Sequence, residues 1–287
     1  MKSTIRSGYL KSFDKDLKTL QKKKGNFKVI SSGLTRKIIF PKYKQETLKR
    51  LYYGNSSKDK LPGVHMVSAV RRNIDSYLKK GGKVPKVKYN PKLVLYNYDQ
   101  INKVVNAKQP QLIYAIDINA CFFRTAYNLK FINKDLFDKA WTKRKEWKFG
   151  LLASIGSLNK QETIEEYKNG VLTKTNMNKE YRNKYSPFYW AVINEVAKVM
   201  MEIANTLNDK FYMWLTDCVY IDREHANKVE KILDKYNYQY KTFYIEFESI
   251  DERVIKWHDF KEGGTKYINY NMFLNYTKDY TPFIKTY

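Results

Sequence analysis

Hydrophobic residues of this chain gather in short runs, and two of these runs lead into an aspartate. Leu112–Ile116 is apolar with a high share of β-formers, which predicts a buried strand that continues directly into Asp117. Phe211–Leu215 predicts a second strand, which leads to Asp217, and Val219–Ile221 predicts a third strand after a tight turn. Two aspartates that lie 100 residues apart in the sequence therefore follow strand ends in a similar way.

Longer periodic segments predict helices between and after these strands. Apolar residues at three- and four-residue steps predict a long helix over Pro187–Leu207 and an amphipathic helix over Arg223–Tyr236. The polar segment Asn159–Tyr185 is typical of a hairpin or an insertion. Further strands are predicted over Thr242–Phe247 and Arg253–Trp257.

Another helix is expected from about residue 134 to residue 156. Arg144 and Lys148 lie four residues apart in it, so one of its faces is cationic. Small residues up to Gly156 close this helix. Such a face is often only a solvated surface, but its place between the two aspartates makes it a candidate for binding phosphates.

The positive charge of the chain is large and unevenly distributed. The formal net charge is +25, and residues 1–110 hold 27 Lys and Arg against 6 Asp and Glu. So strong and one-sided a field indicates a polyanionic partner. The 25 Tyr, 15 Phe and 5 Trp residues offer surfaces on which bases can stack. An AT-rich genome would also favour Lys, Asn and Tyr, although it would not remove the acidic residues.

Cysteine and histidine usage excludes several classes of protein. Cys121 and Cys218 are far apart in the sequence, and the three histidines are scattered, so neither a zinc site nor a histidine-centred hydrolase is expected. Without a disulfide framework a reducing compartment is expected. No apolar run approaches 18 residues and the N-terminus has no signal-peptide core, which predicts a soluble, cytoplasmic protein with no membrane partner.

Changes in composition predict three regions. Residues 1–110 form a basic α/β region that binds nucleic acid, with helices over Lys11–Lys24 and around Glu46–Tyr53. Pro110 marks its boundary with a region 111–250 that contains both aspartates, and residues 251–287 form a short tail.

The two aspartates are the candidate chemistry of the chain. Side by side in one sheet they would repel, by about 4 kcal/mol at about 4 Å and an effective dielectric constant near 20. Divalent cations between them remove this repulsion, and a pair of ions about 3.5–4 Å apart supports phosphoryl transfer. Magnesium needs few protein ligands, often one or two carboxylates with substrate phosphates. Two aspartates without a histidine cluster therefore favour Mg²⁺, with Mn²⁺ as a substitute, over zinc.

Three motifs in order resemble those of family B DNA polymerases, in particular the compact enzymes of phages and mobile elements. Asp117-Ile-Asn-Ala-Cys-Phe-Phe is similar to motif A, and Lys148-Phe-Gly-Leu-Leu-Ala-Ser-Ile-Gly156 has the Lys-to-Gly spacing of motif B. Leu215-Thr-Asp-Cys-Val-Tyr-Ile resembles motif C. Leu215 departs from motif C at its first aspartate, while Leu152 and Ile155 depart from the Asn and Tyr of motif B. The resemblance covers about residues 111–222.

The resemblance implies an α+β fold with a polymerase-type palm, which is an antiparallel sheet with helices on one face, a reduced fingers helix at about 134–156 and a short thumb-like tail. It assigns two Mg²⁺ ions to Asp117 and Asp217, with help from the Ile118 carbonyl. The resemblance also assigns residues to the incoming nucleotide. Arg144 and Lys148 would bind its triphosphate, and Gly156 would lie beside the nascent base pair. Phe122 would lie under the sugar, where it would exclude a 2′-hydroxyl.

The expected activity is template-dependent DNA synthesis, in which dNTPs are added to the 3′-hydroxyl of a DNA primer. The context would be phage or mobile-element replication in the host cytoplasm, alongside other replication proteins. Three alternatives stay open: a primase or other RNA-synthesising palm protein, a degenerate palm that only binds nucleic acid, and a two-metal nuclease. The nuclease would give the cationic face of Arg144 and Lys148 no obvious role.

Overall fold

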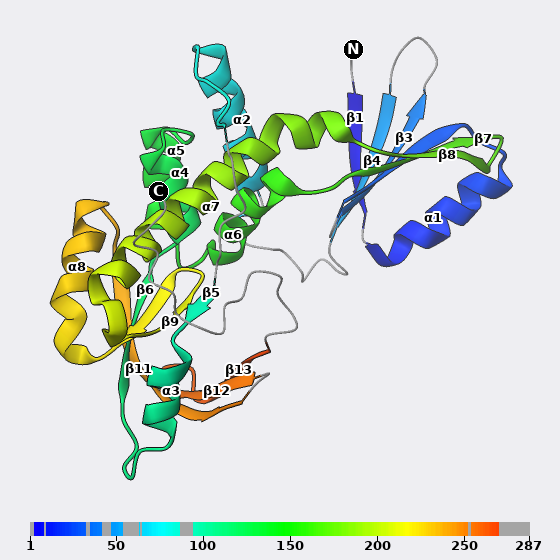
Figure 1. Cartoon of the computed structure of the whole chain (residues 1–287). Helices are drawn as coiled ribbons and strands as arrows, with labels where there is room; N and C mark the ends of the chain where they lie inside the picture. The colour runs from blue at the N-terminus through cyan, green and yellow to red at the C-terminus, as the bar shows by residue number, and fades with distance from the viewer. Residues whose placement is uncertain are drawn as a thin grey trace. The chain divides into compact units, whose positions relative to one another are not determined.

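The computed structural model divides the chain into two compact units (Figure 1). Unit 1 consists of Met1–Pro85 and Phe131–Tyr189, and unit 2 consists of Lys86–Lys130 and Trp190–Tyr287. The structure describes residues 3–8, 10–32, 35–41, 47–53, 63, 65–86, 94–251 and 254–269. Both units combine helices with largely antiparallel sheets, so the chain has the expected α+β class.

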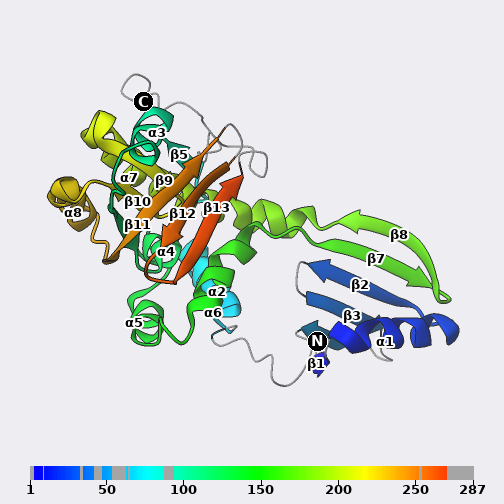
Figure 2. The same ribbon diagram turned by 90° about the horizontal axis from the view of Figure 1, so that it is seen from below.

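Unit 2 contains a sheet of seven described strands in which all neighbours are antiparallel (Figure 2). Its spatial order is β13 (Gly264–Asn269), β12 (Val254–Asp259), β11 (Tyr240–Ile250), β6 (Ile113–Ile118), β10 (Cys218–Ile221), β9 (Phe211–Leu215) and β5 (Val94–Tyr96). The strands predicted from apolar runs, β6, β9 and β10, lie side by side within this sheet.

Both faces of the unit 2 sheet are covered by helices. The helices concerned are α3 (Tyr98–Val105), α7 (Lys179–Leu207) and α8 (Ala226–Lys235). Ile116 of β6 packs in one core with residues of α7 and α8, whereas its neighbour Ala115 packs in a second core with Ile101 of α3. The expectation of helices on one face only is therefore wrong. The first four residues of β6 are all buried, and such an apolar strand requires cover on both sides.

The expected boundaries at residues 110 and 250 differ from those of the two units. Val94–Tyr96 pairs with β9, and α3 packs on the same sheet, so the segment before Pro110 contributes to unit 2. Residues 131–189 belong to unit 1. The expected thumb-like tail contributes β12 and β13 to the sheet, and its residues 270–287 lie outside the described part of the chain.

Unit 1 contains a sheet of six described strands. Its spatial order is β1 (Ser3–Gly8), β4 (Thr47–Tyr53), β3 (Thr35–Pro41), β2 (Phe27–Ser32), β7 (Thr163–Lys168) and β8 (Val171–Met177). The pair β1–β4 is parallel and the other pairs are antiparallel. Strands β7 and β8 form the hairpin expected in the polar segment. The helix expected around Glu46–Tyr53 is wrong, because β4 pairs with strands on both of its sides and this pairing overrides local propensity.

Helix α1 (Leu10–Lys22), predicted over Lys11–Lys24, covers one face of this sheet. Phe13 of α1 packs with Phe27 and Tyr167, whose rings stack with their centres 4.5 Å apart. The alternation of the strands directs Lys28 and Glu166 to the opposite face, where they form an ion pair of 2.7 Å. One face of the sheet is thus apolar and the other is polar.

The remaining helices of unit 1 form a second cluster. They are α2 (Met66–Lys79), α5 (Lys134–Thr142), α6 (Lys148–Gly156) and the first residues of α7. Tyr77, Phe131 and Phe188 make edge-to-face ring contacts in this cluster. Gly150 of α6 lies against the backbone of Gly63, since an added Cβ would come within 2.1 Å of the Gly63 carbonyl oxygen. Only glycine allows so close an approach.

A single helix over residues 134–156 is not observed. Residues 143–147 separate α5 from α6 as a series of turns. Trp147 in this break is buried, and its ring makes an edge contact with His65 at 4.6 Å between centres. Four of the five residues in the break are charged, three of them positively. The helix is interrupted where the Trp147 side chain packs into the interior of this cluster.

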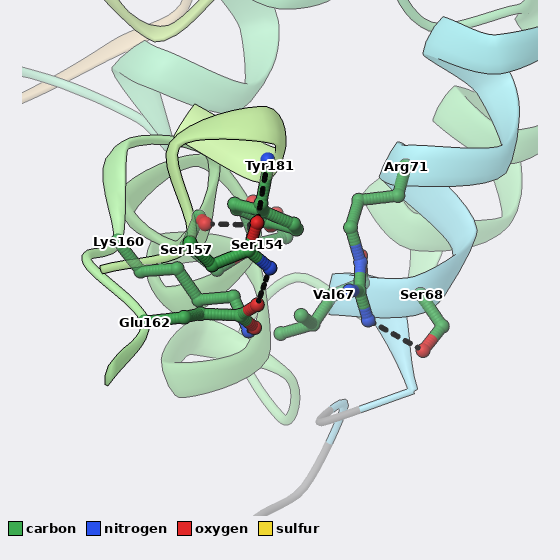
Figure 3. A network of polar contacts seen from close by, with 9 residues as sticks. Val67, Ser68, Arg71, Ser154, Ser157, Lys160, Glu162 and Tyr181 are labelled. Carbon is green, nitrogen blue, oxygen red and sulfur yellow. Dashed lines mark hydrogen bonds and ion pairs between the residues drawn. The ribbon is translucent and has the colours of Figure 1, made fainter. Parts of the chain in front are cut away.

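A polar network fixes the start of α7 (Figure 3). The Tyr181 hydroxyl donates to the Ser157 carbonyl at 2.8 Å, and the Ser157 hydroxyl donates to the Ser154 carbonyl at 2.9 Å. The Lys160 ammonium lies 4.7 Å from the centre of the Tyr181 ring, and burial raises the pKa of Tyr181 to about 12. This network joins the first turn of α7 to the end of α6. Helix α7 accordingly begins at Lys179, before the predicted start at Pro187.

The described helices include none that is both long enough and apolar enough to cross a membrane.

Candidate active site

Asp117 lies near the end of β6, between two other strands. In the antiparallel register it is paired with Cys218 of β10 on one side and with Lys241 of β11 on the other. Its side chain is 22% exposed, so the carboxylate is open to solvent although the strand before it is buried. The buried part of β6 thus holds this partly exposed carboxylate near the end of a central strand.

Asp217 lies in the tight turn that joins β9 to β10. Its carbonyl accepts a hydrogen bond of 3.0 Å from the Ile118 amide, and the next residue, Cys218, is the register partner of Asp117. The two aspartates, 100 positions apart in the sequence, are therefore brought together at the same end of neighbouring strands. Ile118, the position assigned a metal-binding carbonyl, is the last residue of β6 and is 2% exposed.

Electrostatic effects on neighbouring groups agree with this placement. Burial, followed by the charges of Asp217 and Asp117, raises the pKa of the Cys121 thiol well above its usual value. Burial and the same two charges also raise the pKa of Cys218. Both thiols remain protonated and unreactive at neutral pH. Cys121 packs in the core formed with α7 and α8, and Cys218 packs in the core formed with α3.

The backbone beside each aspartate adopts an uncommon conformation. Thr216 has a φ of 56°, and Ala120, which precedes α4 (Cys121–Asn128), has a φ of 46°. Left-handed backbone is unfavourable for a β-branched residue and is found where the surrounding structure enforces it. The Thr216 carbonyl accepts a hydrogen bond of 3.0 Å from the indole of the buried Trp214. This bond helps to fix the turn that carries Asp217.

Two lysines that the sequence reasoning missed lie beside Asp117. The Lys241 ammonium forms an ion pair with the Asp117 carboxylate at 2.6 Å. Burial opposes the charge of Lys241, but the hydrogen bond to Asp117 and the charges of Asp117 and Asp217 outweigh it and raise its pKa. Lys261 extends from the turn between β12 and β13, and burial, followed by the charge of Lys241, lowers its pKa.

The pair of aspartates fits the donor set that Mg²⁺ uses. Magnesium is commonly bound through one or two carboxylates, with water and substrate phosphates completing its octahedron. Among the described residues, no cluster of three or more His, Cys, Asp and Glu side chains could form a fuller protein cage. The ion pair with Lys241 is partly exposed, and such pairs contribute little free energy, about 0–1 kcal/mol. A divalent ion can therefore compete with Lys241 for Asp117.

The other predicted site residues are divided between the units. Phe122 is the second residue of α4 in unit 2, where it is partly buried and packs on the core formed with α7 and α8. Arg144, Lys148 and Gly156 belong to unit 1.

The expected cationic helix face is not formed as predicted. Arg144 lies in the break between α5 and α6, where its guanidinium is 5.1 Å from the centre of the Trp141 ring. Lys148 is the exposed first residue of α6. Gly156 is the last residue of α6, and an added Cβ would meet no atom within 4 Å. Arg144 and Lys148 are consequently not stacked on one helix.

Comparison of the chain with models of known protein families and with curated proteins finds no match.

Proposed function

We propose that the protein is a template-dependent DNA polymerase that adds dNTPs to a primer 3′-hydroxyl with the help of two Mg²⁺ ions. The observation that supports this most directly is the meeting of Asp117 and Asp217 at one end of β6 and β10. The order of the three motifs in the sequence supports it independently. In this proposal unit 2 is the palm, and α5 and α6 are a divided fingers region.

Asp117 and Asp217 would hold the metal ions, with the Ile118 carbonyl as a further ligand. When bound, such ions activate the attacking hydroxyl and stabilise the leaving pyrophosphate. The chain holds the two carboxylates in place. The buried part of β6 fixes the strand that carries Asp117, and Trp214 fixes the turn that carries Asp217 through its hydrogen bond to Thr216. The thiols of Cys121 and Cys218 are buried and contribute no competing ligand, because Mg²⁺ prefers oxygen ligands.

The motif resemblance assigns Arg144 and Lys148 to the triphosphate of the incoming nucleotide and Gly156 to the nascent base pair. An added Cβ at Gly156 would meet no atom within 4 Å. Phe122 would lie under the sugar and select deoxynucleotides by steric exclusion of a 2′-hydroxyl.

The polar face of the unit 1 sheet would bind the backbone of the DNA primer-template. Lys28, Glu166 and Lys168 contribute to the lining of an open hollow of about 340 Å³, which is also lined by Asn26, Phe27, Ile39 and Tyr167. Lysines on a sheet surface bind phosphates without reading sequence, so affinity should fall steeply with salt.

The ion pair between Lys241 and Asp117 favours a second candidate function. A lysine that already neutralises Asp117 is compatible with a palm that binds nucleic acid without catalysis. The two candidates differ in one property: only the polymerase requires a divalent ion at the aspartates.

The test is primer extension on a DNA template with Mg²⁺, comparing wild type with Asp117→Asn and Asp217→Asn. Each substitution keeps the shape of the side chain and removes one charge, and we expect a loss of about 10³-fold or more in rate. Asp234→Asn, an exposed position on α8, is the matched control and should retain full activity. Extension that persists in both site variants rules the mechanism out.

The same assay separates the alternatives. Synthesis from rNTPs without a primer would identify a primase. Salt-sensitive DNA binding with no incorporation of any nucleotide would identify the binding protein.

A further inference from the structure

Lys241 and Lys261 lie on two different elements, and the charge of Asp117 acts on the pKa of both. Lys241 is on β11, opposite Asp117, and reaches it at 2.6 Å. Lys261 follows β12, and its ammonium lies 4.9 Å from the centre of the Phe243 ring, two residues beyond Lys241 on the same strand. Because residues two apart in a strand share a face, the Lys261 ammonium lies on the face of β11 that carries Lys241, and each lysine acts on the pKa of the other.

The described contacts fix Lys261 in this place. The Lys261 amide donates to the Asp259 carboxylate at 3.0 Å, and the Glu262 amide donates to the same oxygen at 3.0 Å. Asp259 is 2% exposed and also pairs with Lys266 at 2.6 Å, so the turn that carries Lys261 is anchored in the sheet. The backbone of Lys261 is thus fixed through the Asp259 carboxylate, while its ammonium group lies over the Phe243 ring.

We infer that Lys241 and Lys261 form a binding site for phosphate oxygens, which opens when a divalent ion takes Asp117 from Lys241. The inference rests on the proposed function in one respect, the binding of a metal ion at Asp117. Its ligand class is the phosphate group of a nucleic-acid strand or of a nucleoside triphosphate.

The charges explain why the two events are linked. Without a metal ion, Asp117 compensates the charge of Lys241, and a phosphate gains little from the pair of lysines. Once a divalent ion binds Asp117, two neighbouring ammonium groups lose this compensation, and an anion that accepts hydrogen bonds from both becomes favourable. Metal ion and phosphate therefore bind with positive coupling, each raising the affinity for the other by the same factor.

The first measurement is Mn²⁺ binding to the full chain, followed by the electron paramagnetic resonance signal of free Mn²⁺. Lys241→Gln removes the competitor for Asp117, and we expect about threefold to fivefold tighter binding, as befits a partly exposed ion pair. Lys261→Gln makes the same charge change without breaking the ion pair and should have a smaller effect. Lys256→Gln, an exposed position on β12, should have none.

The second measurement is the affinity for a labelled single-stranded oligonucleotide, and separately for dTTP, with and without Mn²⁺. In the wild type, Mn²⁺ should tighten binding of one of these probes by about tenfold. In Lys241→Gln and in Lys261→Gln the gain should fall to about twofold, whereas Lys256→Gln should retain it. Coupling to the oligonucleotide assigns the site to the nucleic-acid strand, and coupling to dTTP assigns it to the incoming nucleotide.

Failure of this inference differs from failure of the polymerase proposal. If Lys241→Gln changes neither Mn²⁺ affinity nor the coupling, while Asp117→Asn abolishes Mn²⁺ binding, the phosphate site is refuted and the polymerase proposal stands. If the wild-type protein binds no Mn²⁺ in a manner that depends on Asp117, both are refuted.

Discussion

The sheets of the two units differ in what lies on their faces. In unit 2, strand β6 has its first four residues buried between helices on both sides. In unit 1, helix α1 covers one face, and all seven residues of the edge strand β8 are exposed. The polar face of the unit 1 sheet carries two rows of side chains across β3, β2, β7 and β8: Ile39, Lys28, Glu166 and Lys174, and then Lys37, Ile30, Ile164 and Asn176.

This difference suits one sheet to metal binding and the other to polyanion binding. A pair of carboxylates must be held at a fixed separation to share metal ions, and a sheet packed on both faces provides that rigidity. Binding of a polyanion needs many cations on an accessible surface but no fixed geometry. Unit 2 fits the first requirement at Asp117 and Asp217, and unit 1 fits the second at Lys37, Lys168 and Lys174 on the face opposite α1.

The largest expected effect is on stability. Trp214→Ala in unit 2 removes a fully buried indole and its hydrogen bond to Thr216, and should cost about 3–5 kcal/mol. Ile30→Ala on the polar face of unit 1 removes a partly exposed side chain and should cost less than about 1 kcal/mol. Urea unfolding followed by hydrogen exchange of each unit measures both. Equal costs would show that the two sheets do not differ in packing.

The next effect concerns nucleic-acid affinity. The triple variant Lys37→Gln, Lys168→Gln, Lys174→Gln should weaken binding of a DNA duplex by about tenfold to thirtyfold and lower the salt slope by about 2 to 3. A second triple variant provides the control, since it neutralises three exposed lysines of unit 2: Lys228, Lys231 and Lys256. Fluorescence anisotropy against salt concentration compares them. Equal losses would mean that total charge matters and the polar face does not.

Sugar selection should respond to a smaller change in unit 2. Phe122→Ala should lower the preference for dNTP over rNTP, expressed as a ratio of kcat/KM, by about tenfold, because the ring no longer excludes the 2′-hydroxyl. Tyr267→Ala, which removes a 65% exposed ring from β13, is the control. An unchanged ratio in Phe122→Ala would assign this ring to the core alone.

The smallest expected effect is the pH dependence of the Asp259–Lys266 pair in unit 2. Burial opposes the charge of Asp259, but Lys266 and the Glu262 and Lys261 amides outweigh it, so its pKa is lowered. The pKa of Lys266 is raised, since its bonds to Asp259 and Glu262 outweigh burial. The contribution of the pair is therefore present between the two ordinary pKa values. It is lost as pH falls through the lowered pKa of Asp259, or rises through the raised pKa of Lys266.

The corresponding measurement is thermal unfolding of wild type and Asp259→Asn from pH 3 to pH 11. We expect a difference of about 1 kcal/mol at neutral pH, which shrinks below about pH 4 and above about pH 10.5. A difference that stays constant over the whole range would show that the effect of the substitution is not electrostatic.

The sequence predicted the central strands of unit 2 because their apolar runs are short, bounded and rich in β-formers. It did not predict the register that sets Lys241 opposite Asp117. The local sequence around a lysine on a partly exposed strand does not indicate which residue of a neighbouring strand it pairs with. The period-2 pattern around Lys241 could at most have placed it on an accessible face of a strand.

Two other differences have the same origin in tertiary contacts. Strand β4 has the local appearance of a basic helix and is a strand because β1 and β3 pair with it. The helix over residues 134–156 is interrupted where Trp147 is buried beside Gly63. The periodicity of a segment does not predict which distant residues it pairs with or packs against.

Selection for heat resistance at Thr216, which has a left-handed backbone, should raise stability at the expense of activity. Glycine at this position would relieve the unfavourable φ of 56° and should appear early among heat-resistant variants. The same replacement would free the turn that positions Asp217. Gains in thermal tolerance obtained at this residue should therefore be paired with slower turnover, and a variant library sorted on both traits would show them moving in opposite directions.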